Sequence, residues 1–464
     1  MLTGYWHLAP EALVVIGALA ALFGEFLPGR DKGAAYLAAA LAAVAALLVA
    51  FGGTAGAMAF GQIQPDGIAR FARVSVAGLT ALWALWVAGR GMRGERRRDA
   101  IALAMFAAAG GMLLSMAQDL IVMYIALELS TMPAYILMGY RRDDVRGLEG
   151  ALKYFLLSML TSVIMLYGLS FVYGVSGTTA FAEISLEAAG TLGLVAVLLT
   201  LVGLLAKMSA APFHYWAPDA YAGAQPAAVA FVSTVPKIAG ITVMARILSV
   251  VAPQMPELAP ILSLAAAASM VLGNFAALPQ TDLRRLMAYS GVAHTGYVLM
   301  ALAAGPPIGY RSAVFYAVAY AVPSMAIMLL AAEEHTDVTG IGGLSSRRPW
   351  LAWFTVVWLL SLIGIPPLAG FFGKLYLFSA AVSGSSWVLL VIALLTSVVS
   401  AGYYFRIIRA AFLGERPPAE DEGENDLSTE SPAAVVALTG LVVVVILMGV
   451  GVSPILRGLG VPLG

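Results

Sequence analysis

The sequence predicts an all-α integral membrane protein, and two observations carry that prediction. Of its 464 residues, 61% are hydrophobic and only 11% are charged, whereas soluble domains are about half apolar and about a quarter charged. Nearly the whole chain also divides into apolar runs of about 20 residues, the length that crosses a bilayer core about 30 Å thick. These runs predict about fourteen transmembrane helices, two of them broken.

The predicted helices follow one another with short polar loops between them, which leave no room for a separate soluble domain. Breaks are predicted near Pro212 and within the run Ile363–Gly373, which contains Pro366 and Pro367, because proline lacks the helical N–H and clashes with the preceding turn. The predicted helices cover residues 10–27, 34–52, 71–89, 100–116, 119–139, 151–175, 190–209, 226–251, 259–279, 286–304, 312–332, 350–382 (long and broken), 387–412 and 432–456.

The basic residues separate between alternate loops, which supports the helix count. The poorer set of loops holds Arg70, Arg73, Arg311 and Arg457. Because short cytoplasmic loops carry the positive excess, both termini are predicted to face away from the cytoplasm, and the acidic stretch Glu420–Asp426 is predicted to be a solvated cytoplasmic loop. The richer set of loops holds Arg30, Lys32, Arg90, Arg93, Arg96, Arg97, Arg98, Arg141, Arg142, Arg146, Arg284, Arg285, Arg347, Arg348, Arg406, Arg409 and Arg416.

Composition also excludes several classes of function. The formal net charge is zero, so no basic field indicates a nucleic-acid partner. The chain has no cysteine, which excludes disulfides, thiol nucleophiles and cysteine-ligated iron–sulfur clusters. We therefore predict no catalytic group, cofactor site or metal site in this chain, and we expect any redox cofactor in another subunit.

The lysines are placed differently from the arginines. Arginines mostly line the loops, whereas four of the five lysines fall inside apolar segments: Lys153, Lys207, Lys237 and Lys374. Glu128 adds a carboxylate at membrane depth. A charge at the bilayer centre costs about 2.5 to 3.5 kcal/mol on insertion scales, so several together need a use or a buried partner. A proton relay is one such use, because lysine can release a proton and arginine stays charged.

The alternative is that these charges snorkel to the interface or form static ion pairs. Arg246, close to a helix end, is assigned to snorkelling. Lys207 and Lys374 each lie beside a predicted break, and irregular backbone at membrane depth is tolerated where it lines a cavity or is buried in protein. The two lysines are about five helices apart, and a repeat of five helices must be inverted in the membrane.

Two histidines extend the set of candidate relay groups. His214 follows Lys207 by seven residues, two turns along the same face of an intact helix. His294 shares a helix face with Ser290 and Tyr297, and histidine is a plausible relay because its unperturbed pKa lies near neutrality. A histidine that donates to a helix carbonyl is the alternative for His294.

Six stretches carry a resemblance to a known family. They are Leu127–Ser130, Gly150–Phe155, Lys207 with Ala211–Asp219, Val235–Lys237, Gln280–Ser290 and Gly364–Lys374. In this order they resemble the antiporter-like membrane subunits of respiratory complex I, a family shared with Mrp-type cation/proton antiporters and membrane-bound hydrogenases. The short chain, Lys374 at the second break and the end of the chain soon after the last predicted helix are similar to the N-type (subunit 2 type) subunits of NADH-quinone oxidoreductase.

The resemblance implies a division of roles. It implies that Glu128 and Lys153 modulate charge, that Lys207 switches the first half-channel, and that Lys237 with His294 forms the central connection. Lys374 would exchange the proton with the far side, and His214 would be an accessory polar site. The chain departs from the family pattern at Arg284 and Arg285, where a lysine is common, and lacks the tryptophan that often precedes the glutamate. These departures bear on the parent complex more than on the proton path.

The apolar runs and the paired breaks predict a domain organisation, and the resemblance implies a setting. Three N-terminal transmembrane helices occupy residues 1–99, a first five-helix repeat 100–251, a second inverted repeat 259–412, and a cytoplasmic loop with the final helix 413–464. The expected location is the bacterial inner (plasma) membrane, beside neighbouring antiporter-like and small membrane subunits. Quinone, NADH, FMN and iron–sulfur clusters are expected in partner subunits. The alternatives are an Mrp-type sodium/proton antiporter or membrane-bound hydrogenase subunit, and an inert structural spacer.

Overall fold

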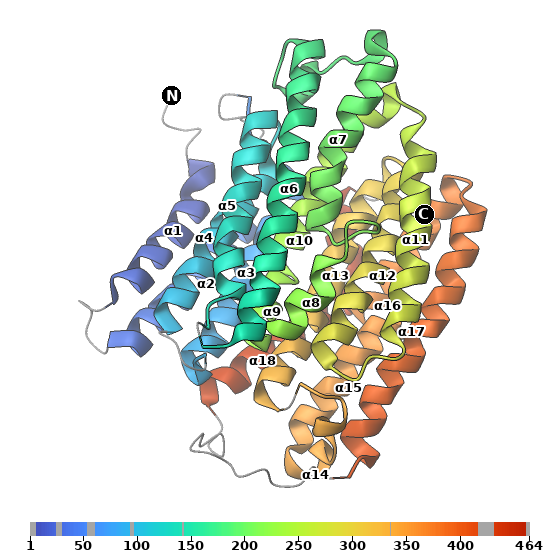
Figure 1. Cartoon of the computed structure of the whole chain (residues 1–464). Coiled ribbons are helices and arrows are strands. Elements are labelled where there is room, and N and C mark those ends of the chain that lie inside the picture. The colour runs from blue at the N-terminus through green and yellow to red at the C-terminus, as the bar shows by residue number, and fades with distance from the viewer. Residues whose placement is uncertain are drawn as a thin grey trace.

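The computed structural model describes residues 6–24, 30–52, 61–92, 97–141, 143–334, 336–415 and 431–460. Within these ranges the chain is a bundle of α-helices joined by short loops (Figure 1). The helices are α1 Ala9–Leu22, α2 Arg30–Phe51, α3 Gly67–Arg90, α4 Arg97–Met116, α5 Leu120–Met138, α6 Val145–Ser176, α7 Thr191–Lys207, α8 Trp216–Gly223, α9 Pro226–Val232, α10 Val235–Val251, α11 Leu258–Ala277, α12 Leu283–Ala304, α13 Ile308–Glu333, α14 Leu344–Arg347, α15 Pro349–Ile363, α16 Ala369–Ser383, α17 Trp387–Leu413, α18 Pro432–Val450 and α19 Val452–Leu459.

In the described part of the chain, 11 helical segments are long and apolar enough to cross a membrane. One of them, Pro226–Gln254, comprises α9, α10 and a short 3₁₀ helix, Ala252–Gln254. Four further apolar helices are shorter: Trp6–Leu22, Thr191–Lys207, Pro349–Ile363 and Ala369–Ser383. The chain is therefore an all-helical, multi-pass membrane protein, as its composition predicts.

Both predicted breaks are present. α7 ends at Lys207 and α8 begins only at Trp216, so the run containing Pro212 is irregular. α15 ends at Ile363 with Gly364 in the left-handed region at φ 95°, and α16 begins at Ala369. A residue at this φ is disfavoured unless it is glycine, which explains why the helix stops there.

A third break, between α9 and α10, was not predicted from the sequence. Thr234 leaves the helical region, and its backbone N–H bonds to the carbonyl of Phe231 instead of that of Ala230. The Thr234 hydroxyl donates to the freed Ala230 carbonyl at 2.7 Å. Because this bond gives the backbone carbonyl a partner, the helix can be interrupted here without leaving a polar group unpaired in an apolar environment.

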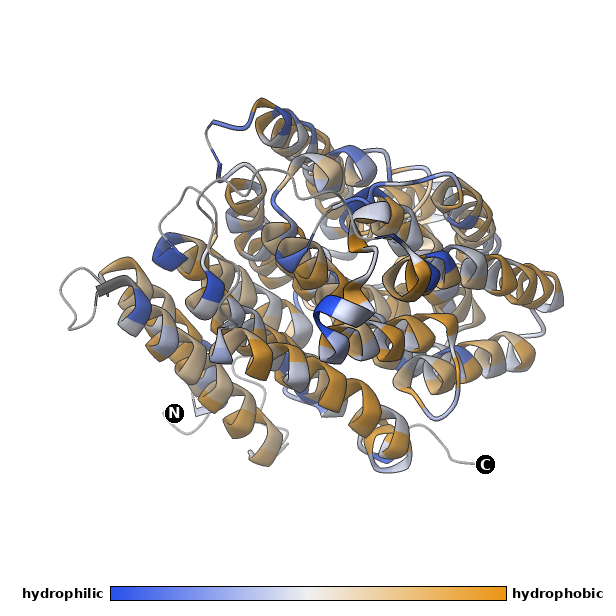
Figure 2. Ribbon diagram, turned by 90° about the horizontal axis from the view of Figure 1, so that it is seen from below, coloured by the Kyte–Doolittle hydropathy of each residue, from blue (hydrophilic) through white to orange (hydrophobic). Residues whose placement is uncertain are grey.

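The centre of the bundle and its periphery differ in burial. The helices α10, α12 and α13 are almost wholly enclosed by protein, whereas α2, α6, α17 and α18 expose apolar side chains outward. Figure 2 shows that the peripheral helices are mostly hydrophobic. Exposed apolar faces are favourable in lipid, which is as apolar as leucine, so packing rather than hydrophobicity holds the helices together. Gly273 shows this packing, since an added Cβ would lie 2.4 Å from the Ala293 backbone nitrogen.

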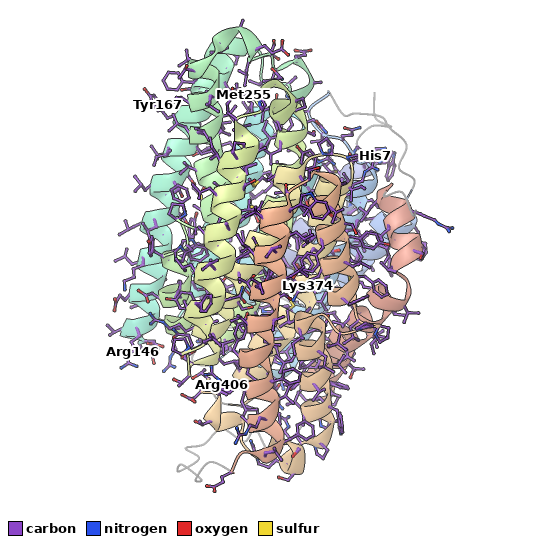
Figure 3. All side chains as sticks on the ribbon, turned by 90° about the vertical axis from the view of Figure 1, so that its right-hand side faces the viewer. His7, Arg146, Tyr167, Met255, Lys374 and Arg406 are labelled. Carbon is purple, nitrogen blue, oxygen red and sulfur yellow. The ribbon has the colours of Figure 1, made fainter. Side chains whose placement is uncertain are left out.

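The two ends of the bundle carry different loops. Arg146 and Arg406 lie toward one end, and His7 and Met255 lie toward the other (Figure 3). This arrangement agrees with the separation of basic residues between alternate loops. Several predicted loop residues lie outside the described residues, namely Arg93, Arg96, Arg142, Arg416 and the acidic stretch Glu420–Asp426, as does the side chain of Arg30.

The prediction that Arg246 snorkels to the interface is wrong. Its side chain is buried, its Nη2 lies 2.6 Å from Oδ1 of Asp66, and its Nε donates to the Ser115 carbonyl at 2.9 Å. Asp66 is also the N-cap of α3, where it accepts from the Ala69 N–H. The counter-charge comes from a distant part of the chain, so local sequence did not reveal it.

Candidate functional site

Three buried lysines lie at the three helix breaks. Lys207 is the last residue of α7, Lys237 lies in the first turn of α10, and Lys374 lies in the second turn of α16. Each is at most 6% exposed, and Lys374 lies about midway between the two ends of the bundle (Figure 3). Burying an ammonium group is costly unless it has polar partners. The contacts of each Nζ atom therefore show how each buried charge is stabilised.

Lys207 pairs with Glu128 across α5 and α7. Its Nζ lies 3.7 Å from Glu128 Oε1 and 3.3 Å from the Thr131 hydroxyl, and it also donates to the Tyr135 hydroxyl. The same Glu128 oxygen accepts from the Ser162 hydroxyl of α6 at 2.7 Å. The second carboxylate oxygen, Oε2, is buried with no hydrogen-bond partner among the described residues. The pair is thus incompletely satisfied, because this oxygen can still accept a proton or a hydrogen bond.

The structure does not bring Lys153 into contact with Glu128. Its Nζ instead contacts Glu149 at 2.8 Å and Asp219 of α8 at 2.9 Å, and its side chain is 44% exposed. Asp219 also lies 3.5 Å from Arg285. Because α6 turns Lys153 toward the surface near the Arg146 end of the bundle, this lysine belongs to an exposed ion-pair cluster.

His214 lies in the irregular run between α7 and α8. It is 3% exposed, and its ring centroid lies 4.4 Å from that of Tyr215. Its Nδ1 is buried without a hydrogen-bond partner in the described part of the chain. A buried polar atom of this kind usually contacts an ordered water or marks a functional site.

Lys237 faces a small central cavity. The cavity has a volume of about 10 Å³, about enough for one water molecule. Its lining includes His294 and Thr295 of α12 and Tyr316 and Tyr320 of α13. Lys237 makes no hydrogen bond or ion pair with any described residue, and the cavity that it faces is lined mostly by apolar surface with a few polar groups.

His294 is held by tyrosines on both ring nitrogens. Its Nδ1 is 2.6 Å from the Tyr316 hydroxyl, and its Nε2 is 3.1 Å from the Tyr404 hydroxyl. The Tyr404 hydroxyl lies 2.5 Å from that of Ser290, one turn before His294. The predicted common face of Ser290 and His294 is confirmed, and both ring nitrogens of His294 contact tyrosine hydroxyls rather than a carbonyl among the described residues.

Lys374 is bound by the second break itself. Its Nζ donates to the Ile363 carbonyl and to the Ser397 hydroxyl, both at 2.9 Å, and it lies 5.6 Å from the Tyr297 ring centroid. The Ile363 carbonyl is available because α15 ends there, so the broken helix supplies an acceptor that an intact helix would use internally. Tyr297 continues the polar contacts to the Thr396 hydroxyl at 3.2 Å.

Comparison with known proteins places these sites in a family. The family model described as "NADH:quinone oxidoreductase/Mrp antiporter, TM" matches residues 117–400. A protein of Acidiphilium cryptum named NADH-quinone oxidoreductase subunit N 1 is 38% identical over 95% of both chains. Subunit N of Rhodospirillum rubrum is 38% identical over 88% of this chain and 87% of its own. The chain belongs to this family.

Solved structures support the same assignment. A chain of respiratory complex I from Thermus thermophilus with bound aureothin matches with a TM-score of 0.80 and 32% identity, covering 98% of both chains. The Mrp complex from Dietzia sp. matches with a TM-score of 0.83 at 22% identity, covering 98% of this chain and 96% of its own, which shows the fold alone. The chain is similar to the N-type subunits. Every predicted site residue lies within residues 117–400, the range that the family model matches.

Sequence reasoning missed most of the tyrosines around these sites. Tyr135 could have been found, because Glu128, Thr131 and Tyr135 are spaced to share one face of α5. Tyr404 had no local signal, since it reaches His294 from a helix far along the chain. Among the described residues, no cluster of three or more histidine, aspartate and glutamate side chains could hold a metal ion.

Proposed function

We propose that this chain is the N-type proton-translocating membrane subunit of an NADH-quinone oxidoreductase (complex I) type enzyme. Its task is to couple quinone reduction in partner subunits to proton transfer through the membrane. The observation that carries the proposal is the presence of Lys207, Lys237 and Lys374, each buried and each at a break in a helix. Lysines so placed can take up and release protons, whereas arginines cannot.

The proposed path begins at the Glu128–Lys207 pair. Moving the carboxylate toward or away from Lys207 changes how strongly the ammonium form is held, so a conformational change becomes proton release. The proton passes through the central cavity beside Lys237 to His294, whose two tyrosine partners allow transfer at either ring nitrogen. Lys374 receives it and exchanges it with the far side of the membrane.

Two further residues have supporting roles in this proposal. Lys153, in its exposed cluster with Glu149 and Asp219, modulates the charge near the entrance from the Arg146 end. His214, buried next to the first break with a free Nδ1, supplies an accessory polar site. Both act on the first half of the path.

The proposed architecture has fourteen membrane crossings, in keeping with the predicted spans. It comprises three N-terminal helices in residues 1–99, a five-helix repeat in 100–251, an inverted repeat in 259–412 and a final helix in 413–464. Support comes from the matching positions of Lys207 and Lys374 beside breaks, because broken helices in corresponding halves are typical of inverted repeats. Repeats related in this way can form one half-channel each.

The proposed setting is the bacterial plasma membrane, with both termini on the non-cytoplasmic side. Arg146 and Arg406 belong to the set of loops that is rich in basic residues, and both lie toward one end of the bundle (Figure 3), which supports a cytoplasmic position for that end. Neighbouring antiporter-like and small membrane subunits are the proposed partners. Quinone, NADH, FMN and iron–sulfur clusters belong to partner subunits, and this chain contributes no redox centre.

Mass spectrometry of proteins that co-purify with this chain from its native membrane in mild detergent tests the proposal. We expect quinone-reductase and iron–sulfur subunits. Recovery of small antiporter subunits without any redox protein would refute it and favour an Mrp-type sodium/proton antiporter. Recovery of hydrogenase subunits would favour a membrane-bound hydrogenase.

A further inference from the structure

The first helix break is held in place by side chains from three other helices. The Trp216 indole N–H of α8 donates to the Ala206 carbonyl at 3.0 Å, and the Ala211 N–H donates to the Ser269 hydroxyl of α11 at 2.9 Å. The third contact comes from α12, where the Thr295 hydroxyl lies 2.7 Å from the Met208 carbonyl oxygen and 2.9 Å from the Gly291 carbonyl oxygen of its own helix, so the nearer acceptor of its one hydrogen is Met208. These bonds replace helical partners that the backbone loses after Lys207.

The backbone between these contacts is strained. Ser209 has φ 59°, in the left-handed region that non-glycine residues rarely adopt, and its hydroxyl is buried without a partner in the described part of the chain. Such a conformation persists only where the surroundings hold it. Loss of one of these hydrogen bonds should therefore loosen the backbone at the break.

Thr295 differs from the other two restraints in what else it touches. It follows His294 directly, and it lines the central cavity that Lys237 faces. The Thr295 side chain thus bonds to Met208, the residue after Lys207, and also lines the cavity that Lys237 and His294 line. All of these groups are buried, and α12 is a continuous helix from Leu283 to Ala304.

We propose that Thr295 is a positioning residue that couples the Lys207 helix end to the central Lys237–His294 site. Through its bond to the Met208 carbonyl, a movement of the α7 end is transmitted to α12 at the position next to His294. This inference rests on the proposed function for its role in pumping, but the restraint itself can be tested separately.

The test of the restraint is hydrogen exchange of the purified, fully assembled complex, followed by mass spectrometry. The variant Thr295→Val keeps the shape of the side chain and removes the hydroxyl, and Thr295→Ser keeps the hydroxyl. Thr242→Val is the matched control, because the Thr242 hydroxyl is also buried but donates only to Ile238 in its own helix.

We expect Thr295→Val to speed exchange of the amides of residues 208–211 by about fivefold, the effect of losing one hydrogen bond on a local opening equilibrium. Thr295→Ser and Thr242→Val should exchange like the wild type. Unchanged exchange in Thr295→Val would show that the hydroxyl does not hold the break and would overturn the proposal.

The test of coupling is proton pumping at equal amounts of assembled complex. We expect Thr295→Val to pump about fivefold more slowly, with recovery in Thr295→Ser. Faster exchange with wild-type pumping would leave Thr295 as a structural restraint only and would overturn the coupling role. Lys207→Ala serves as the reference: wild-type pumping in that variant would refute the proposed function, while the exchange experiment would still decide whether the restraint exists.

Discussion

Replacing Glu128 by glutamine removes the charge of the Lys207 partner and little else. Glutamine has nearly the same shape, and its side-chain oxygen can still accept from the Ser162 hydroxyl, which lies 2.7 Å from Glu128 Oε1. The helices α5, α6 and α7 should therefore keep their packing. Any functional change then reports on the electrostatic attraction between Glu128 and Lys207.

The size of that attraction follows from the geometry. At the 3.7 Å separation of Lys207 Nζ and Glu128 Oε1, Coulomb's law with an effective dielectric constant of about 20 gives about 4 kcal/mol. If only about a quarter of this energy drives proton transfer during turnover, the transfer equilibrium changes about fivefold. We therefore expect Glu128→Gln to pump at no more than about a fifth of the wild-type rate.

The assay is dye-detected acidification of inverted membrane vesicles, driven by the electron donor of the complex and normalised to the amount of assembled complex. The matched control is Glu149→Gln, the same substitution in a partner of Lys153. Glu149 is 62% exposed, and surface ion pairs are worth about 1 kcal/mol or less. We expect Glu149→Gln to pump like the wild type. Wild-type pumping by Glu128→Gln, or equal loss in both variants, would refute the electrostatic reasoning.

Three other predictions follow from burial and packing. Lys374→Ala should abolish most pumping in the same vesicle assay, whereas Lys153→Ala should keep most of it. The reason is that Lys374 is buried and the Lys153 side chain is 44% exposed. Equal effects of the two substitutions would contradict the proposed path. Gly370→Ala should prevent assembly, because an added Cβ would lie 1.8 Å from the Ser361 carbonyl oxygen. The measurement is the yield of intact complex on native gels. Gly174→Ala is the control, because a Cβ added there would have no atom of the described residues within 4 Å. Glu333→Gln should lower the thermal unfolding midpoint of the complex, because it removes the charge of the carboxylate that lies 2.6 Å from Arg90, whose side chain is 8% exposed, and breaking a buried ion pair costs about 3 to 5 kcal/mol. Arg348 keeps its contact with Glu334 at 3.2 Å, so Arg90 accounts for the expected loss. An unchanged midpoint would contradict this.

The ion pairs of Glu333 could not be predicted from local sequence patterns. The carboxylate lies at the end of α13 and contacts Arg90 of α3 at 2.6 Å and Arg348 at 3.1 Å. In the sequence these residues read as unrelated charges at the ends of apolar runs. Ion pairs between distant segments depend on which helices become neighbours, and hydropathy contains no information about that.

By itself the sequence determined the class of the protein and the candidate site. Apolar runs of the right length had to become membrane helices, because lipid offers no partner to an unpaired backbone N–H or carbonyl. The breaks at Pro212 and at Pro366–Pro367 followed from the missing proline N–H. The cost of burying charge at membrane depth singled out Lys153, Lys207, Lys237 and Lys374 as candidates, and the structure buries the last three and leaves the Lys153 side chain 44% exposed.

Only the tertiary structure decided which groups meet. It paired Glu128 with Lys207 rather than with Lys153, and it placed Tyr404 on His294 from a helix far along the chain. It also buried Arg246 against Asp66. The physical reason is the same in each case: a periodic pattern fixes the face of its own helix on which a side chain lies, whereas its partner is fixed by how helices pack, through close contacts between small residues such as Gly273 and Ala293.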